Sequence, residues 1–457
     1  AGFMDRVAER ARERGYPYWR TFTTGKSIGI PHDAYGLTSE GTVFGLLEGD
    51  GGTELTVEGA EPKILTDMAE LATRIPGDIV TNGMTTTGVM ATFRVLVKAK
   101  KAREEDLPLM MTGGPDGDLG ANQIQCYRGA ICLIIDGGGV LFDPDGLDKE
   151  ELRRLAFDRH SSPKRTSIDY DTAKLGPEGF FVKRESAPAT LPDGTQIDDA
   201  AFFHKTFLFT PANRRLVERA GIRAFIPCGG FKDTIHTGNV REFLGIFQEL
   251  EYIVEGANVF FDNTARDVIA SETDILQIKD TTANKGGVTS SSLAEVLSAF
   301  LLRDDYERHL VDDLPTKFRL VRELLDIITR NAEAETQILL ALRESSNRAL
   351  WRLSVDTSEQ LLAFQQRIAA HPALAELDKK SRLAVLQQYT PPVLLELVGV
   401  GRAHEILNSP ELAAYGQAIL TKKLAANALY RHAADWEAFL ARFEAEPAKT
   451  LADLATD

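Results

Sequence analysis

Apolar residues in the first 290 positions follow two patterns that take turns along the chain. Short continuous apolar runs at 107–111, 131–135, 224–227, 252–254 and 275–278 are typical of strands buried on both faces. Between several of them, 89–102, 120–127 and 147–157 carry apolar side chains at three- and four-residue spacing, which indicates helices. This alternation predicts an α/β fold, a Rossmann-like and mostly parallel sheet with helices on both faces.

The two ends of the chain have a different pattern. An amphipathic helix is expected at 3–14 and a second at 63–75, separated by a loop rich in Gly, Ser and Thr. From 293 onward no strand is predicted, and Phe318, Val321 and Leu325 exemplify a helical spacing that prolines such as Pro315 interrupt. We therefore expect an all-helical C-terminal domain over 293–457.

Composition and charge narrow the class of protein. The 457 residues are 43% hydrophobic and carry 52 Lys and Arg against 67 Asp and Glu, a net charge of −15. Such an acidic balance argues against a nucleic-acid partner. No run approaches the roughly 18–20 apolar residues of a membrane span, so no membrane partner is expected. Three cysteines (Cys126, Cys132 and Cys228) form no disulfide framework, which suits the cytoplasm.

A glycine-rich turn follows the apolar run at 107–111 and precedes a predicted helix. Gly114, Gly117 and Gly120 are spaced G-x-x-G-x-x-G, and Pro115 stands where the usual dinucleotide fingerprint has its first glycine. The spacing lets the backbone approach a pyrophosphate at the helix N-terminus, although a plain tight turn would look the same. Asp136 ends the next strand, 19 residues beyond Gly117, where a carboxylate can bind ribose hydroxyls and favour NAD over NADP. A turn residue is the alternative for Asp136, and the complete order of elements favours dinucleotide binding.

Other polar groups follow the later strands. Asn258 and Asn284 each come after a short apolar run, at the strand ends where ligands of parallel sheets bind, and suit a carboxamide or a ribose. The hydroxyls of 289–292 are expected at the start of a helix, as an anion site or as simple caps. Asp148, in the acidic segment 143–148, is interpreted as a helix cap with Glu151 rather than a calcium ligand. The eight histidines have no metal-ligand spacing, so no metal is assigned.

Several segments resemble the glutamate dehydrogenase family. They are Pro-Cys-Gly-Gly at 227–230, Glu-Gly-Ala-Asn at 255–258 and Ala-Asn-Lys-Gly-Gly-Val-Thr-Ser-Ser at 283–291. The turn at 113–122 and the segments at 24–26, 29–33 and 179–182 are similar to the long-chain, NAD-specific members. The resemblance covers most of residues 1–300 and extends loosely into the helical region. It implies three parts of the chain. Residues 1–84 would be the end of a substrate domain with the hinge and an insertion, 85–292 the NAD-binding domain and 293–457 the helical domain.

The resemblance also implies roles for single residues. Thr85 resembles the hinge threonine that contacts the nicotinamide amide, with Thr38 as its rival. The residues expected at NAD are Thr85, Thr86, Gly114, Gly117, Asp118, Leu119, Gly120, Asp136, Cys228, Gly229, Asn258 and Asn284. Val288 and Ser291 would flank the glutamate side chain, with Ser291 bonding its γ-carboxylate. The implied reaction is NAD-dependent oxidative deamination of L-glutamate to 2-oxoglutarate and ammonia.

The family's catalytic lysine, substrate-binding lysines and catalytic aspartate have no counterpart here, because they align upstream of Gly2. The chain also starts at Ala1 without an initiator Met. We therefore expect no catalytic residue in this chain, which alone would bind NAD but turn over little glutamate. The alternatives are a dehydrogenase of another amino acid, and a non-catalytic NAD-binding sensor or assembly module. A homo-oligomer is expected, and the exposed helical faces could form its interface or regulate the hinge.

Overall fold

The computed structural model describes residues 10–11, 13–15, 83–115, 117–157, 167–186, 188–306 and 308–456. These residues divide into two compact units, one within 29–288 (the sheet unit) and one within 1–28 and 289–457 (the helical unit). The helix expected at 63–75 and the rival hinge residue Thr38 lie outside the described residues. Of the helix expected at 3–14, only Arg10, Ala11, Glu13 and Arg14 are described; the first three are helical and Arg14 lies in a turn.

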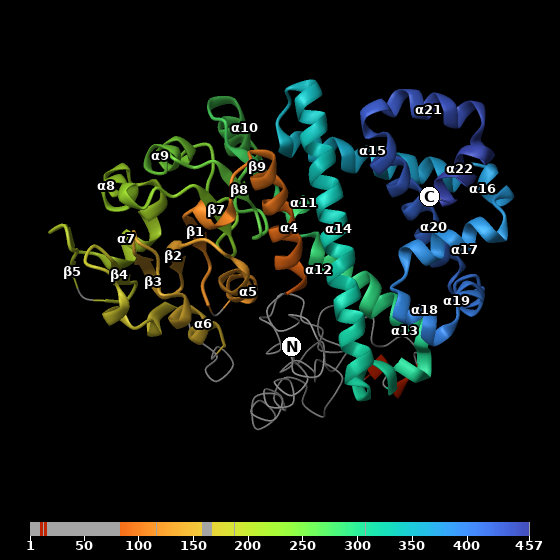
Figure 1. Ribbon diagram of the computed structural model, residues 1–457, viewed down its shortest axis with the longest axis horizontal. Coiled ribbons are helices and arrows are strands. Elements are labelled where there is room, and N and C mark those ends of the chain that lie inside the picture. The colour runs from red at the N-terminus through yellow and green to blue at the C-terminus, as the bar shows by residue number, and fades with distance from the viewer. Residues whose placement is uncertain are drawn as a thin grey trace. The chain divides into compact units, whose positions relative to one another are not determined.

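Seven strands of the described residues form the sheet of the sheet unit (Figure 1), in the order β4-β3-β2-β1-β7-β8-β9. The strands are β1 (Leu109–Thr112), β2 (Ile131–Asp136), β3 (Gly139–Phe142), β4 (Phe180–Lys183), β7 (Ala224–Pro227), β8 (Tyr252–Val254) and β9 (Leu276–Ile278). Neighbours from β2 to β9 pair in parallel, and Leu109 lies opposite both Ile131 and Ala224. β3 and β4 extend one edge in antiparallel fashion. The mostly parallel α/β sheet is therefore confirmed. A separate short hairpin pairs β5 (Ala189–Thr190) with β6 (Gln196–Ile197).

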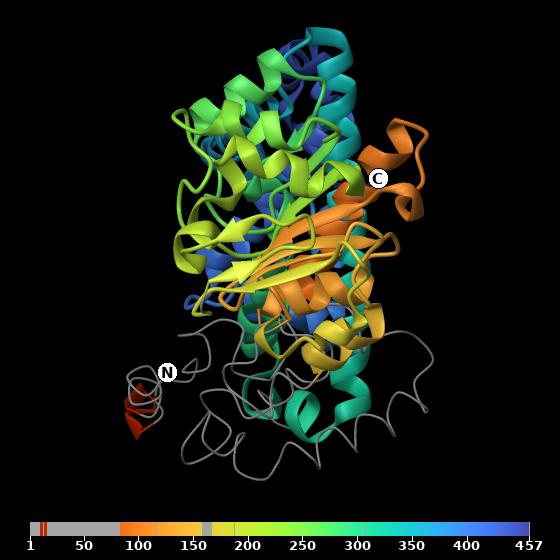
Figure 2. The same cartoon turned by 90° about the vertical axis from the view of Figure 1, so that its left-hand side faces the viewer.

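Helices cover both faces of this sheet. The α-helices described between residues 83 and 290 are α4 (Met84–Ala99), α5 (Asp118–Cys126), α6 (Lys149–Phe157), α7 (Ala200–Thr206), α8 (Arg214–Val217), α9 (Val240–Ile246), α10 (Asn263–Glu272), α11 (Asp280–Ala283) and α12 (Lys285–Ser290). Tyr252 of β8 packs against Phe93 of α4, whereas Phe225 of β7 packs against Phe243 of α9. Phe225 pairs with Ile253, the neighbour of Tyr252, and strand side chains alternate, so the two contacts lie on opposite faces. Figure 2 shows the strands from the side, between helices of the two layers.

Local rules explain where several of these helices begin and end. Asp148 accepts a hydrogen bond from the backbone N–H of Glu151 at 2.7 Å, which confirms the predicted cap of α6. The helix expected at 89–102 is α4, which begins five residues earlier. It ends at Ala99, followed by Lys101 at φ +56°, a left-handed conformation that stops a helix. The early start places Thr85 and Thr86 in the first turn, where burial outweighs the weak helix propensity of β-branched residues.

The sheet has a topological switch point beside β1. The chain passes from β1 to β2 on one side, and later returns to β7 on the other side of β1. Loops that leave the carboxyl ends of β1 and β7 therefore diverge and leave a crevice between them, where ligands of open α/β sheets bind. The glycine turn at 113–117 follows β1, and Cys228 and Gly229 follow β7.

Residues 289–456 are helices and connecting segments wherever they are described, which confirms the predicted helical C-terminal region. The unit contains η11 (Ser291–Leu297, a π-helix), α13 (Ser298–Leu302), η12 (Arg303–Asp305), η13 (Arg308–Asp312), α14 (Leu314–Ser346), α15 (Leu350–Ala370), α16 (Ala373–Glu376), α17 (Lys379–Tyr389), α18 (Pro392–Val398), α19 (Val400–Leu407), α20 (Ala413–His432), η14 (Ala433–Asp435), α21 (Trp436–Ala445) and α22 (Pro447–Thr456). Pro315 lies in the first turn of α14, where its missing N–H is tolerated. The described helices include none with the length and apolarity to cross a membrane.

Candidate functional site

The glycine turn after β1 is fixed to both neighbouring strands. Gly113 adopts φ +79°, a conformation that favours glycine, and its N–H donates to Ile135 O of β2 at 2.8 Å. A β-carbon on Gly113 would lie 2.8 Å from the backbone N of Gly229, at the end of β7. The backbones that follow β1 and β7 therefore approach each other closely, and only glycine allows this approach.

The three glycines of the predicted fingerprint have different surroundings. A β-carbon on Gly114 would overlap the carboxylate of Asp136, and one on Gly120 would overlap the carbonyl oxygen of Gly114. A β-carbon on Gly117 would meet that same oxygen only at 3.5 Å, an ordinary contact. Packing within the protein therefore requires glycine at 114 and 120. At Gly117 the fold leaves room, just before α5 begins at Asp118.

Asp136 is buried at the carboxyl end of β2, and its carboxylate already has partners in the protein. Oδ1 accepts hydrogen bonds from Gly138 N at 2.8 Å and Ser167 Oγ at 2.6 Å, and Oδ2 accepts from Ser167 N at 2.8 Å. A carboxylate offers about four acceptor positions. The structure therefore holds Asp136 rigidly beside the glycine turn and leaves it about one position for a ligand.

Cys228 and Gly229 continue β7 into the crevice. The N–H of Cys228 donates to Thr112 O at 2.7 Å, and the Thr112 hydroxyl donates to Gly229 O at 2.5 Å. These two bonds extend the pairing of β1 and β7 past the strand ends. Burial raises the pKa of the Cys228 thiol well above its ordinary value, so the thiol stays protonated and is not an activated nucleophile.

Asn258 and Asn284 lie side by side, although 26 residues separate them. The Asn284 side chain donates through Nδ2 to Asn258 Oδ1 at 2.7 Å and to Gly256 O at 3.0 Å. Gly256 also lies under Leu119 of α5, because a β-carbon there would be 2.6 Å from Leu119 Cδ2. The loops after β8 and β9 and the start of α5 therefore meet at one edge of the sheet.

A buried cluster of charges supports the loop that carries Asn258. Arg266 of α10 donates to both carboxylate oxygens of Glu255, through Nε at 2.8 Å and Nη2 at 2.5 Å, and Gln277 Nε2 donates to Glu255 at 3.0 Å. Asp280 lies 3.8 Å from the same guanidinium and accepts from the N–H of Val259, which has φ +50°. Burial raises the pKa of Glu255 to about 7, because desolvation outweighs the opposing bonds from Arg266.

The threonine pair at the start of α4 is buried against α12. A β-carbon on Gly287 would lie 2.9 Å from Thr85 Oγ1, and one on Gly286 would overlap Met84 O. The hydroxyl of Thr86 is buried and has no hydrogen-bond partner among the described residues. The start of α4 thus carries one unsatisfied buried polar group, which is uncommon in native proteins.

The segment 285–292 corrects one expectation. The hydroxyls of 289–292 were expected at a helix start, but α12 already begins at Lys285 and continues into η11. They therefore lie within helical backbone and do not cap its N-terminus. Val288 in α12 is 69% exposed, and Ser291 is the first residue of η11.

Sequence reasoning missed two groups at this edge. One is Ser167, which holds the Asp136 carboxylate across 31 residues of chain. The other is the cluster of Glu255, Arg266 and Asp280, each buried. A signal for Glu255 existed, because a carboxylate directly after the apolar run 252–254 must be paired if it is buried. The sequence did not indicate which cation pairs with it.

Comparison with known proteins defines the class. The family model for glutamate/leucine/phenylalanine/valine dehydrogenases matches residues 77–337, which is more than half of the chain. The chain belongs to this family of amino-acid dehydrogenases.

Individual relatives agree with this class. The chain is 31% identical over 442 residues to glutamate dehydrogenase 2 of Dictyostelium discoideum, covering 94% of this chain and 36% of that protein. It is also 31% identical over 457 residues to the NAD-specific glutamate dehydrogenase of Saccharomyces cerevisiae, covering 95% and 36%. The chain thus spans about a third of the length of these relatives. A crystal structure of Plasmodium falciparum glutamate dehydrogenase matches with a TM-score of 0.34 at 14% identity, covering 61% of this chain and 58% of that one.

Proposed function

We propose that this chain supplies the NAD-binding part, and some of the glutamate pocket, of an NAD-dependent glutamate dehydrogenase. The reaction would convert L-glutamate, NAD and water to 2-oxoglutarate, ammonia and NADH. The observation that supports this most is the convergence of the glycine turn, Asp136 and the Asn258–Asn284 pair on the carboxyl edge of the sheet, around its switch point. The membership in an amino-acid dehydrogenase family supports the same reaction class.

The space at Gly117 fits the phosphate end of a dinucleotide. Gly114 and Gly120 are required by internal packing, but a β-carbon on Gly117 would meet no atom of the described residues closer than 3.5 Å. Its α-carbon directly precedes the N-terminus of α5, the end of a helix where backbone N–H groups and the helix dipole favour anions. Gly117 would therefore leave room for the pyrophosphate, with Asp118 and Leu119 opening the helix beside it and Asp136 accepting from a ribose hydroxyl.

The amide pair fits the other end of the cofactor. Because Asn284 uses Nδ2 and Asn258 uses Oδ1 in their own contacts, Asn258 keeps an N–H donor and Asn284 keeps a carbonyl acceptor. A carboxamide such as that of nicotinamide offers the matching acceptor and donor. Thr85 and Thr86 would complete this end, since the Thr86 hydroxyl has no partner in the described part of the chain.

The bound cofactor would supply the hydride acceptor for the Cα–H bond of glutamate, and this chain would hold and orient the nicotinamide ring. Val288 would contact the substrate's apolar stem, because its side chain is largely exposed. Ser291 would donate a hydrogen bond to the γ-carboxylate. A dehydrogenase of leucine or valine would have no use for that hydroxyl, so Ser291 is the residue that discriminates among substrates of the family.

Binding of NADH, followed by its fluorescence, tests the cofactor site. We expect saturable binding to the chain, and we expect Gly117→Ala to weaken it about tenfold or more, a loss of about 1.4 kcal/mol. Its melting temperature should stay unchanged, because the new methyl group makes only ordinary contacts with the described residues, the nearest at 3.5 Å. Gly245→Ala is the matched control, since Gly245 lies exposed in α9 with nothing within 4 Å of its β-carbon position. Absence of NADH binding by the wild-type chain, or equal affinity in the Gly117 and Gly245 variants, would overturn the proposal.

A further inference from the structure

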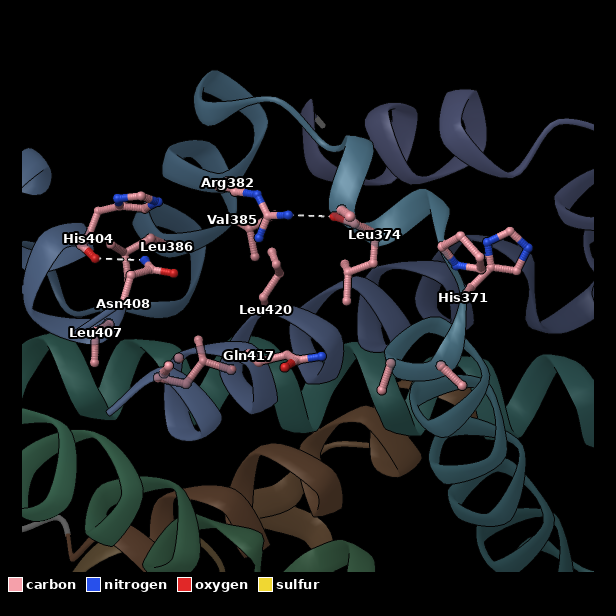
Figure 3. Close-up of a pocket in the computed structure, with 17 residues that line it drawn as sticks. His371, Leu374, Arg382, Val385, Leu386, His404, Leu407, Asn408, Gln417 and Leu420 are labelled. Atoms are coloured by element: carbon pink, nitrogen blue, oxygen red, sulfur yellow. Dashed lines mark hydrogen bonds between the residues drawn. The ribbon is translucent and has the colours of Figure 1, made fainter. Parts of the chain in front are cut away.

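A cavity of about 410 Å³ lies inside the helical unit, far along the chain from the residues proposed to bind NAD. The ends of α15 and α19 and the helices α16, α17 and α20 surround it (Figure 3). Its volume falls in the range of about 300–1,000 Å³ that is typical of small-molecule sites. Polar and apolar groups both line its walls, and Val385, Leu407 and Leu420 are among the apolar side chains. The cavity therefore has the size and lining of a ligand site.

The polar part of the lining is one-sided in charge. Among the 17 residues that line the cavity none is acidic, and Arg382 is the single Lys or Arg. The whole chain has the opposite bias, with 67 acidic against 52 basic residues. A ligand that enters the cavity therefore meets one positive charge that no carboxylate of the lining opposes.

Arg382 is held in place before any ligand arrives. Its Nε donates to Leu377 O at 2.9 Å and its Nη2 donates to Leu374 O at 2.5 Å. Figure 3 shows the guanidinium between the two ends of the cavity, directed toward the carbonyl of Leu374. Among the described residues Nη1 has no hydrogen-bond partner, so Arg382 keeps donors for an anion. Such a pre-ordered side chain loses little conformational entropy on binding.

Two histidines add to the polar groups at the ends of the cavity. His371 accepts the N–H of Ala373 at its Nδ1, at 3.1 Å, so its neutral ring carries the proton on Nε2 and can donate. His404 Nε2 is buried and has no partner among the described residues. Because every buried polar atom costs free energy unless it is paired, this atom favours a polar ligand group nearby.

The surroundings of His404 agree with a positive potential. Its pKa is lowered, first by burial and then by the positive charges of Lys379 and Arg382, which outweigh the opposite effect of Glu405. The ring is therefore neutral at neutral pH, and no carboxylate compensates the charge of Arg382 in the cavity. The N-terminus of α20, where Ala413 and Gly416 line the cavity, adds the positive end of a 20-residue helix dipole.

We propose that the helical unit binds a small organic carboxylate with an apolar body in this cavity. The carboxylate pairs with Arg382, and the apolar body packs against the side chains that Val385, Leu407 and Leu420 present. This site is separate from the one proposed for NAD, because all of its lining residues belong to the helical unit.

Calorimetric titration of the whole chain with three eight-carbon probes tests the proposal. Octanoate supplies the carboxylate, octan-1-ol is its neutral counterpart and octylamine is its cationic counterpart. We expect saturable, one-to-one binding of octanoate, with affinity at least tenfold higher than that of octan-1-ol and no binding of octylamine. Equal binding of all three probes, or no saturable binding of octanoate at millimolar concentration, would overturn it.

Two substitutions locate the binding. Ala413→Phe fills the cavity from the exposed first residue of α20 and should abolish octanoate binding. Ala363→Phe makes the same change at an exposed position of α15 outside the lining and should leave binding intact. Octanoate binding that persists unchanged in Ala413→Phe would place the ligand elsewhere and refute the assignment. Both variants should bind NADH as the wild type does, which keeps this test apart from that of the cofactor site.

Arg382→Gln tests the charge itself. It should weaken the binding of octanoate at least tenfold and leave the binding of octan-1-ol unchanged. Because Arg382 also bonds the carbonyls of Leu374 and Leu377, this variant can lose stability. Its thermal melting is measured first, and Ala413→Phe decides the question if the variant does not fold. An unchanged octanoate affinity in folded Arg382→Gln would contradict the proposal.

Discussion

The carboxylate of Asp136 lies against the α-carbon of Gly114, so closely that a β-carbon on residue 114 would overlap Oδ2. Two adjacent parallel strands end here: β1 ends at Thr112, two residues before Gly114, and β2 ends at Asp136 itself. Asp136 cannot move away easily, because Ser167 and Gly138 hold both of its oxygens. Residue 114 is therefore glycine for a structural reason, independent of any ligand.

This contact predicts a specific coupling between the two positions. Gly114→Ala should lower the free energy of unfolding by about 1–3 kcal/mol, the usual cost of overpacking a filled site. Asp136→Ala removes the overlapping carboxylate, so the double variant should be less destabilised than the sum of the two single changes. Chemical denaturation of the four proteins measures the coupling. Strict additivity would show that the close contact does not exist in solution.

The buried pair of Glu255 and Arg266 yields a second prediction. Arg266→Met leaves Glu255 buried without its cation, and we expect a loss of about 3–5 kcal/mol in the free energy of unfolding. Arg241→Met breaks an exposed pair with Glu272 and should cost far less, because solvent screens exposed ion pairs, which makes it the matched control. Urea denaturation of both variants measures the difference, and similar losses would contradict the assigned role of burial.

The stability of Arg266→Met should also depend on pH, in a direction that the pKa of Glu255 determines. The folded-state pKa of Glu255 is already raised to about 7 from an ordinary 4.5, and without Arg266 it should rise further. A raised carboxyl pKa means that the folded state binds the proton more tightly, so its stability falls as pH rises above 4.5. Arg266→Met should accordingly be less destabilised at pH 5 than at pH 8.

The pKa of Glu151 is shifted in the opposite direction from that of Glu255. Its pKa is lowered to about 2, first by the hydrogen bond from Arg154 at 2.6 Å and also by the N–H of Asp171 and the charge of Lys174. A lowered carboxyl pKa gives stability that is present above pH 4.5 and is lost as pH falls toward 2. Because Arg154 and Lys174 are partly solvated, we expect about 1–2 kcal/mol.

Glu151→Gln should therefore flatten the acid limb of the stability curve between pH 5 and pH 2. Glu150→Gln is the matched control, since Glu150 is its largely exposed neighbour with a surface partner, Arg153. Thermal melting across this pH range distinguishes the two variants. An identical pH dependence of both variants and the wild type would show that Glu151 does not titrate abnormally.

Much of the sheet could be predicted from the sequence because its central strands are buried on both faces. The runs at 131–135 and 224–227 are wholly apolar and correspond to β2 and β7. β3 and β4 were not predicted, because β3 starts at Gly139 within a glycine triplet that suggests only a turn. In β4, moreover, buried and partly exposed residues alternate, as expected of the sheet's antiparallel edge.

The parts of the candidate site that consist of a short sequence motif could be predicted. The parts that depend on contacts between residues far apart in the chain could not. The glycine spacing and the acidic residue at the end of β2 can be read from a single short stretch of sequence, 113–136. By contrast, the contact of Ser167 with Asp136 and that of Asn284 with Asn258 join residues 31 and 26 apart. Only the fold determines which loops meet at the carboxyl edge. No local pattern in the sequence contains that information.

The start of α4 against α12 gives the last prediction, based on two consecutive glycines of one helix. A β-carbon on Gly286 would overlap the backbone carbonyl of Met84, whereas one on Gly287 would lie 2.9 Å from the hydroxyl of Thr85. The hydroxyl of Thr85 can move aside by rotation about χ1, but the backbone carbonyl of Met84 cannot. Gly286→Ala should therefore lower the free energy of unfolding by about 1–3 kcal/mol.

Gly287→Ala is the matched control, because both glycines lie in α12 and both gain up to about 1 kcal/mol of helix propensity from alanine. We expect this variant to be close to neutral. Amide hydrogen exchange at Thr87, which donates to Gly83 O across the first turn of α4, should accelerate in Gly286→Ala alone. Equal exchange rates in the two variants would mean that α12 does not hold the start of α4. The proposed position of Thr85 at the nicotinamide would then lose its structural support.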